Sequence, residues 1–184
     1  MDKILRWISG FSFVVLLMAV LLVAPIDFTP LRDHPFYPVM MNRVQDFQPT
    51  EYLSGGELKV GWSKFSIVPD HPMQMAGYKP RAEFESVHDS LYMTILSIDN
   101  GGTTAYFVSV DLLIFPPTLK EKINERLGSD WSGFIYYSAS HTHTSVGGWD
   151  PSLLGQILMG SYDEVYVNDL AEKAVLHLKL ASRN

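Results

Sequence analysis

The most regular hydrophobic pattern lies near the end of the chain, where apolar residues recur at the i, i+3, i+4, i+7 spacing of a helix. This stripe consists of Val167, Leu170, Ala171, Ala174, Val175 and Leu178. A second stripe, Leu119, Ile123 and Leu127, follows Pro116-Pro117 and stops at Gly128, where a helix C-cap usually lies. The pattern predicts two amphipathic helices, one from about 117 to 127 and one running to Ser182.

Four apolar runs have the length of strands, at 58–62, 91–98, 105–110 and 133–138. Asp99-Asn100-Gly101-Gly102 joins the second run to the third and favours a hairpin. The run at 105–110 is apolar at nearly every position, which predicts a strand buried on both faces. The order of elements predicts an α/β fold, a mixed sheet with packed helices, over residues 57–184. Because few strands are available to finish the sheet, we expect an incomplete domain.

The N-terminal segment is apolar on every face. No charged residue lies between Trp7 and Ile26, a run of 20 residues. At about 1.5 Å per residue, a helix of this length spans the hydrocarbon core of a bilayer. Residues 1–26 therefore read as a transmembrane signal anchor, or as a cleaved signal ending near Leu22-Val23-Ala24.

The charges beside this segment suggest an orientation. Lys3 and Arg6 precede the apolar run, which favours a cytoplasmic N-terminus and a domain on the periplasmic or extracellular side. The domain would be secreted if the signal were cleaved. From 27 to 56 the prolines at 30, 35, 38 and 49 disfavour both helix and central strand, so this region reads as a spacer.

Composition excludes several functions. With 14 Lys+Arg against 20 Asp+Glu the formal charge is −6, and there is no basic run, so we expect no nucleic acid as a partner. Cysteine is absent, which excludes disulfide scaffolds, thiol nucleophiles and cysteine-ligated metals. Any metal would be held by His, carboxylate or Tyr oxygen.

Candidate chemistry concentrates in Ser138–Asp150, just after the strand at 133–138. His141 and His143 lie at i and i+2, so on extended backbone both imidazoles would point to one face and reach one centre. Imidazole suits Zn²⁺ as a ligand. A zinc site needs three or four protein ligands, however, and this segment supplies two at most. The alternative is that one ring bonds a backbone carbonyl and the other faces solvent.

Five ordered blocks together resemble the N-terminal region of the neutral/alkaline (non-lysosomal) ceramidases, and the similarity covers about Leu58 to Leu178. The blocks are Val60-Gly61-Trp62 with Val68-Pro69, Met75-Ala76-Gly77-Tyr78, Val87-His88-Asp89-Ser90-Leu91-Tyr92, Val108-Ser109-Val110-Asp111-Leu112, and Ser138-Ala139-Ser140-His141-Thr142-His143-Thr144. Departures are small: Thr144-Ser145-Val146, for example, stands where the family usually has Ser-Gly-Pro.

This resemblance implies a Zn²⁺-dependent amide hydrolase that splits ceramide, a membrane lipid, into a sphingoid base and a fatty acid. It further implies that His141 is a zinc ligand and that His143 lies beside the metal and contacts the substrate or its oxyanion. In such a site zinc-bound water attacks the amide carbonyl and the departing amine is then protonated.

Two other residues are candidates for the site. His88 either acts in catalysis or simply bonds its neighbour Asp89. Asp111 ends a buried strand, where its carboxylate either orients a ligand or caps the helix beginning near Pro117. The other histidines, His34, His71 and His177, lack partners at ligand spacing and read as surface residues.

The remaining zinc ligands of the family, a further His, a Glu and a Tyr, lie well downstream of the His pair, and His177 comes too soon to match. We therefore expect the N-terminal portion of the enzyme, with a C-terminal half or a separate chain completing the site. Alone, the chain would bind zinc poorly and be inactive. The alternative is a membrane-anchored, non-catalytic domain that keeps the fold and pairs with a partner chain.

Overall fold

The computed structural model describes residues 2–22, 27–47, 56–77 and 82–182, which fall into two compact units divided between Glu51 and Tyr52. In the first unit, α1 (Asp2–Leu22) is exposed along its described side chains. Its segment Lys3–Leu21 is long and apolar enough to cross a membrane. The predicted apolar helix is confirmed, and it is compatible with a signal sequence or a membrane anchor. The candidate cleavage position at 23–25 lies outside the described residues.

The expectation that prolines exclude helix from residues 27–56 is wrong. A 3₁₀ turn, η1 (Leu31–Asp33), precedes the ten-residue helix α2 (Phe36–Gln45). Pro35 is the N-cap of α2 and Pro38 lies in its first turn. Proline is tolerated there because the first N–H groups of a helix have no intrahelical acceptor.

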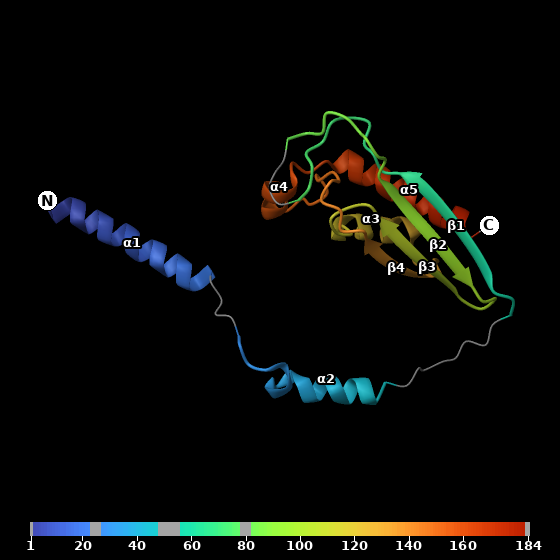
Figure 1. Cartoon of the computed structure of the whole chain (residues 1–184), viewed down its shortest axis with the longest axis horizontal. Helices are drawn as coiled ribbons and strands as arrows, with labels where there is room; N and C mark the ends of the chain where they lie inside the picture. Colours follow the sequence, from blue (N-terminus) through green and yellow to red (C-terminus); the bar gives the residue numbers. More distant parts are fainter. Residues whose placement is uncertain (1, 23–26, 48–55, 78–81, 183–184) are drawn as a thin grey trace. The chain divides into compact units, whose positions relative to one another are not determined.

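The second unit carries the sheet and the remaining helices (Figure 1). Its elements in order are β1 (Lys59–Ser66), β2 (Tyr92–Asp99), β3 (Thr104–Val110), α3 (Pro117–Leu127), β4 (Phe134–Ala139), α4 (Leu153–Met159) and α5 (Glu164–Ala181). The mixed α/β fold, the four strands and the two long helices expected here are all present. The short helix α4 was not predicted.

The four strands follow one another in space in the order β1-β2-β3-β4. β1, β2 and β3 are antiparallel neighbours, whereas β4 runs parallel to β3 after the chain has passed through α3. The predicted hairpin between β2 and β3 is confirmed. Its turn is closed by Asn100, whose side-chain oxygen accepts from the backbone N–H groups of Gly102 and Thr103.

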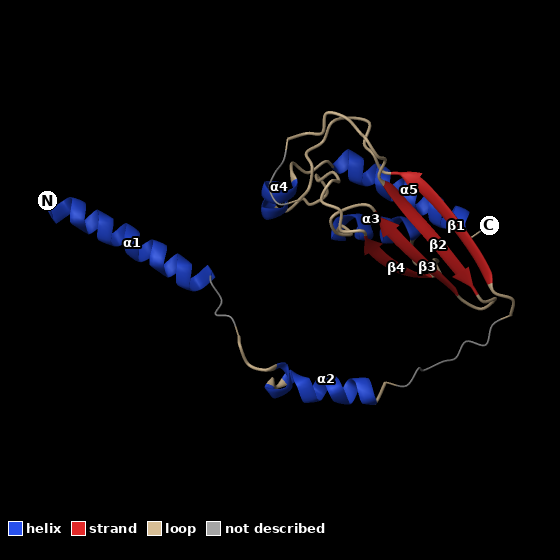
Figure 2. Cartoon of the chain, in the orientation of Figure 1, coloured by secondary structure: helices blue, strands red, loops and turns tan. Residues whose placement is uncertain are grey.

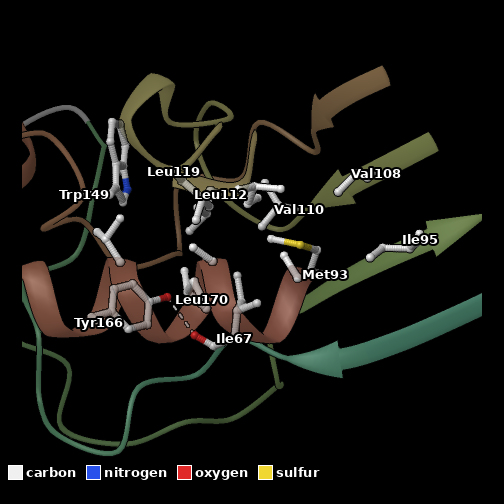
Figure 3. Packing of buried hydrophobic residues seen from close by; sticks show 14 of the residues in the cluster. Ile67, Met93, Ile95, Val108, Val110, Leu112, Leu119, Trp149, Tyr166 and Leu170 are labelled. Atoms are coloured by element: carbon white, nitrogen blue, oxygen red, sulfur yellow. Dashed lines mark hydrogen bonds between the residues drawn. The ribbon is translucent and has the colours of Figure 1, made fainter. Parts of the chain in front are cut away.

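One face of the sheet is covered by α5, which packs across β1 and β2, and by α3, which packs against α5 (Figure 2). The core between these layers contains Met93, Ile95, Val108, Val110 and Leu170, each at most 1% exposed (Figure 3). In the same layer the Tyr166 hydroxyl donates to the carbonyl of Ile67 at 2.7 Å. This hydrogen bond ties the start of α5 to the end of β1.

β3 departs from the expectation of burial on both faces. Tyr106, Val108 and Val110 are buried under the helices, as expected. Phe107, which points to the opposite face, is 46% exposed. Within the described residues the second face of the sheet has no covering layer, although its composition is that of a covered one.

α5 can approach β1 closely because position 61 is a glycine. A Cβ at Gly61 would lie 1.9 Å from the carbonyl oxygen of Ala181 and 3.1 Å from the carbonyl carbon. Gly61→Ala should therefore push α5 off the sheet and lower the free energy of unfolding by about 1–3 kcal/mol, the usual cost of overpacking. The measurement is urea unfolding of the full chain in detergent. Gly56→Ala is the matched control, because nothing lies within 4 Å of that position, and its effect should be close to zero.

The N-terminus of α5 is also linked to the loop after β1. Asp163 caps α5 by accepting from the Tyr166 N–H at 2.9 Å, and its other oxygen lies 2.9 Å from Nε2 of His71. Nδ1 of His71 lies 2.8 Å from the carboxylate of Asp70. The hydrogen bonds to Asp70 and then to Asp163 raise the pKa of His71 above its ordinary value.

A raised folded-state pKa makes this contact favourable below pH about 6.5, the unfolded value, and the contribution is lost as the pH rises through the folded pKa. His71→Asn should therefore lower the unfolding temperature most near pH 6, and less at each step toward pH 9. His88→Asn is the control, because that ring is exposed and bonds just its neighbour Asp89. A difference independent of pH would contradict the prediction.

Candidate metal and catalytic site

The site begins where β3 and β4 end. Because the two strands are parallel, their carboxyl ends meet at one edge of the sheet, the edge at which α/β proteins commonly place their sites. The pairing continues one step past the strands, where the backbone N–H of Ser140 donates to the carbonyl of Val110 at 3.0 Å. His141 and His143 follow immediately in the loop.

The loop after His143 is held by backbone contacts and is buried. The Ala76 N–H donates to the Ser145 carbonyl at 2.8 Å, and the Gly147 N–H donates to the Gln74 carbonyl at 2.7 Å. Trp149 is 1% exposed, and its Nε1 donates to the Val146 carbonyl at 3.0 Å. These contacts fix the base of the loop, so the histidines project from a rigid support.

The structure brings the two histidines together. The ring centroids of His141 and His143 lie 5.0 Å apart, with the ring planes at 85° to each other. The backbone at His141 has φ of +60°, in the left-handed region that residues other than glycine rarely adopt. The expected proximity is present, but a tight turn, and not the alternation of an extended strand, produces it.

The orientation of His141 is set by a backbone carbonyl. Its Nδ1 lies 2.7 Å from the carbonyl oxygen of Leu113, in the loop that follows β3. A carbonyl can accept but cannot donate, so Nδ1 carries the proton and Nε2 of the neutral ring keeps its lone pair. Metal-binding histidines are commonly oriented in this way. The contact of a ring with a backbone carbonyl, given above as the alternative to metal binding, is therefore compatible with metal binding through Nε2.

Asp111 lies at the same edge but is engaged by the backbone. Its Oδ2 accepts from the Tyr92 N–H at 3.0 Å, while its own N–H donates to the Tyr92 carbonyl at 2.9 Å. The carboxylate thus locks the carboxyl end of β3 to the start of β2. Of the two alternatives for Asp111, the helix-capping one is wrong, because the N-cap of α3 is Pro116.

His88 bonds its neighbour, as the simpler interpretation predicted. Its Nδ1 lies 3.1 Å from the Asp89 carboxylate, and its side chain is 96% exposed. His88 also lines an open cavity of about 370 Å³ together with apolar side chains that include Met75, Phe84 and Val146. Thr144, one residue after His143, belongs to the same lining.

The three histidines set aside from the site each have a local partner. His34 contacts Asp27 at 2.8 Å, and His71 bridges the two aspartates described above. His177 is partly buried. Its Nδ1 lies 3.1 Å from the Ser63 hydroxyl, its ring centroid lies 4.5 Å from that of Phe65, and partial burial lowers its pKa.

The described residues fit part of a zinc site and not a whole one. His141 is an exposed residue, and its contact with the Leu113 carbonyl selects the tautomer that a ligand needs. Among residues 2–22, 27–47, 56–77 and 82–182, no three His, Asp or Glu side chains are grouped closely enough to hold a metal ion. A metal at His141 would therefore need donors from elsewhere, and no catalytic step can be derived from these residues alone.

Sequence reasoning identified the histidines but missed what orients them. The Leu113 carbonyl and the left-handed backbone at His141 carry no sequence signal, because any residue supplies a carbonyl and positive φ is uncommon for residues other than glycine. Met73 is 5% exposed and belongs to the core, whereas Met75 lines the cavity. Tyr78, which belongs to the same block, lies outside the described residues.

Comparison with known proteins identifies the fold. No family model matches the chain, and no curated protein matches it in sequence. The crystal structure of neutral ceramidase from Pseudomonas aeruginosa is similar, with a TM-score of 0.62 and 18% identity, over 69% of this chain and 22% of that chain. A ceramidase complexed with C2 aligns with a TM-score of 0.60 and 19% identity, over 69% of this chain and 21% of that chain. The chain thus shares the fold of a part of these ceramidases and spans about a fifth of their length.

Proposed function

We propose that this chain is the N-terminal portion of a zinc-dependent amide hydrolase of the ceramidase type, acting on an N-acylated lipid. The observation that carries the proposal is the fold it shares with two solved ceramidases. The ordered sequence blocks that resemble the family run through that same fold, and they end at the His pair.

The geometry at the edge of the sheet supports particular roles. His141 would bind zinc through Nε2, since Nδ1 is committed to the Leu113 carbonyl. His143, with its ring centroid 5.0 Å from that of His141, would contact the substrate amide or the charge that develops on its oxygen. When bound, zinc would supply Lewis acidity to the amide and lower the pKa of a coordinated water.

The cavity of about 370 Å³ supports a lipid as substrate. Its size falls in the usual range for ligand pockets, and most of its lining is apolar. Thr144 connects it in sequence to His143. A hydrocarbon chain in this cavity would have its polar end toward the histidines. Asp111 acts at a distance by fixing the strand end, and we assign His88 to the rim of the cavity.

A second candidate follows from the small number of donors. Since the described residues group no three possible metal ligands, the chain also fits a membrane-anchored, non-catalytic domain that needs a partner chain. The N-terminal helix would hold either form at a membrane. The two candidates differ in whether His141 is needed for hydrolysis.

Zinc affinity tests how much of the site lies in this chain. We expect the purified full chain in detergent to bind Zn²⁺ more weakly than about 1 μM, equivalent to about −8 kcal/mol, because two imidazoles cannot complete the coordination. His141→Asn should weaken zinc binding further. His34→Asn, a control in the first unit, should leave the zinc affinity unchanged. Isothermal titration calorimetry gives the affinity. Stoichiometric submicromolar binding would show that a complete site exists here.

Hydrolysis tests the function itself. In membranes from the cells that produce the protein, a chelator should abolish part of the hydrolysis of N-acylsphingosine. Replacing the native gene by one encoding His141→Asn should lower the rate of this chelator-sensitive hydrolysis by about 100-fold or more, because a metal ligand is lost. His34→Asn should leave it unchanged. Unchanged hydrolysis in the His141→Asn cells would favour the non-catalytic candidate.

A further inference from the structure

The helix α2 carries a stripe of five apolar side chains and one arginine along its whole length. These side chains recur at the i, i+3, i+4, i+7, i+8, i+11 spacing that places residues on one face of a helix. They line one groove and are Phe36, Val39, Met40, Arg43, Val44 and Phe47, the last of which lies just past the end of the helix. We call these six residues the α2 stripe. Asn42 and Gln45 lie away from it on the helix.

The α2 stripe is exposed. Val44 is 62% exposed and Phe47 is 75% exposed. No residue of α2, all of which lies within the described part of the chain, is buried. Isolated helices shorter than about 12–15 residues are marginally stable in water, and most helices gain their stability by packing an amphipathic face. A helix of ten residues therefore needs a surface on which to bury this stripe.

Arg43 restricts what that surface can be. It lies within the stripe, one turn from Val39 and Met40 on one side and from Phe47 on the other. It takes part in none of the ion pairs among the described residues. An arginine lays its hydrocarbon stem on apolar surroundings and keeps its guanidinium among polar groups, where the fork of N–H groups matches phosphate or carboxylate. The covering surface must therefore offer hydrocarbon with anionic oxygens beside it.

The position of α2 in the chain favours a membrane as that surface. The preceding helix α1 contains the segment Lys3–Leu21, which is long and apolar enough to cross a membrane. The 13 residues 23–35 separate the two helices. At about 3.5 Å per residue they reach roughly 45 Å at most, about the thickness of a bilayer with its headgroups. Whenever α1 lies in a membrane, the α2 stripe is thus confined close to lipid, which raises its effective concentration there.

We infer that the α2 stripe docks on the surface of a phospholipid bilayer. The helix lies along the interface, its apolar side chains enter the acyl chains, and the Arg43 guanidinium meets the phosphates. This inference shares the membrane role of α1 with the proposed function and does not depend on zinc or hydrolysis. Docking would shorten the chain between the membrane and β1 from the 36 residues 23–58 to the 11 residues 48–58.

Protein surfaces fit the α2 stripe less well. A second copy of the stripe would bury the apolar side chains, but it contains no acidic residue, so both Arg43 guanidinium groups would be left without a carboxylate. The second unit, or a further part of the same polypeptide, would need an apolar groove with an acidic group placed beside Arg43, because burying an unpaired cation is costly. A phospholipid surface supplies hydrocarbon and phosphate over its whole area and needs no matching groove.

The absence of cysteine allows the inference to be tested by spin labelling at single introduced cysteines. The full chain in phosphatidylcholine vesicles carries one nitroxide, at Met40→Cys or Val44→Cys on the stripe, or at the matched controls Asn42→Cys and Gln45→Cys. Electron paramagnetic resonance compares the collisions of each label with oxygen, which concentrates in lipid, and with a nickel chelate, which stays in water. We expect collisions with oxygen to dominate at 40 and 44, and collisions with nickel to dominate at 42 and 45.

Two results would overturn the inference. Dominant nickel collisions at all four positions would place the stripe in water. Exclusion of both reagents at 40 and 44 would show that protein covers the stripe, whether from this polypeptide, a second copy or another chain. The four labels report separately, so a label that disturbs the helix alters the result at its own position and the others still decide between lipid, water and protein.

Arg43 provides a second measurement. Arg43→Glu replaces the guanidinium by a carboxylate that the phosphates repel, so the label at Val44→Cys should shift from oxygen collisions toward nickel collisions. Arg32→Glu is the matched control, because it makes the same charge change in η1, outside the α2 stripe. It should leave the label unchanged. Equal responses to the two substitutions would contradict the docking of the stripe on phosphates.

A label in α1 separates this inference from the proposed function. Val15→Cys should report oxygen collisions if α1 spans the bilayer. Dominant nickel collisions at this position, with dominant oxygen collisions at 40 and 44, would contradict the membrane-spanning role of α1 and support the docking of α2. Hydrolysis that depends on His141, in a protein whose α2 labels all meet nickel, would support the proposed function and overturn this inference.

Discussion

The parallel pairing of β3 with β4 is the constraint on which the rest of this structure depends. The chain leaves β3, crosses through α3 and returns in the same direction, so the carboxyl ends of both strands reach the same edge. The loop after β3 then supplies the Leu113 carbonyl, and the loop after β4 supplies His141, 2.7 Å away. An antiparallel β4 would have carried the histidines to the opposite edge. The topology, more than any single side chain, creates the candidate site.

The two faces of the sheet have different roles that follow from the period-two alternation of strands. The face under α3 and α5 holds the core and accounts for the stability of the unit, with Gly61 permitting the close approach of α5. The opposite face carries exposed apolar side chains, among them Trp62, Phe107 and Tyr136.

The site joins a rigid base to an incomplete donor set. Buried Trp149 and the backbone bonds from residues 74 and 76 hold the loop, while the left-handed backbone at His141 turns the first ring against the second. Strained positions of this kind persist where surrounding contacts enforce them, and they are frequent at functional sites. Within the described residues this arrangement supplies two imidazoles, fewer than the three or four protein ligands of a zinc site.

Local patterns determined most of the secondary structure of this protein. Hydrophobic periodicity located four strands and the helices α3 and α5, and glycines marked the hairpin and the end of α3, because these signals depend on neighbouring residues alone. The prolines before and in the first turn of α2 wrongly indicated that no helix forms there, because proline is tolerated at the start of a helix. The helix α4 has too few residues for a periodic signal. Only the tertiary structure decided the tautomer of His141, the engagement of Asp111 by Tyr92 and the exposure of the apolar second face of β3. Each of these depends on contacts, made or absent, between segments distant in sequence, which no local pattern encodes.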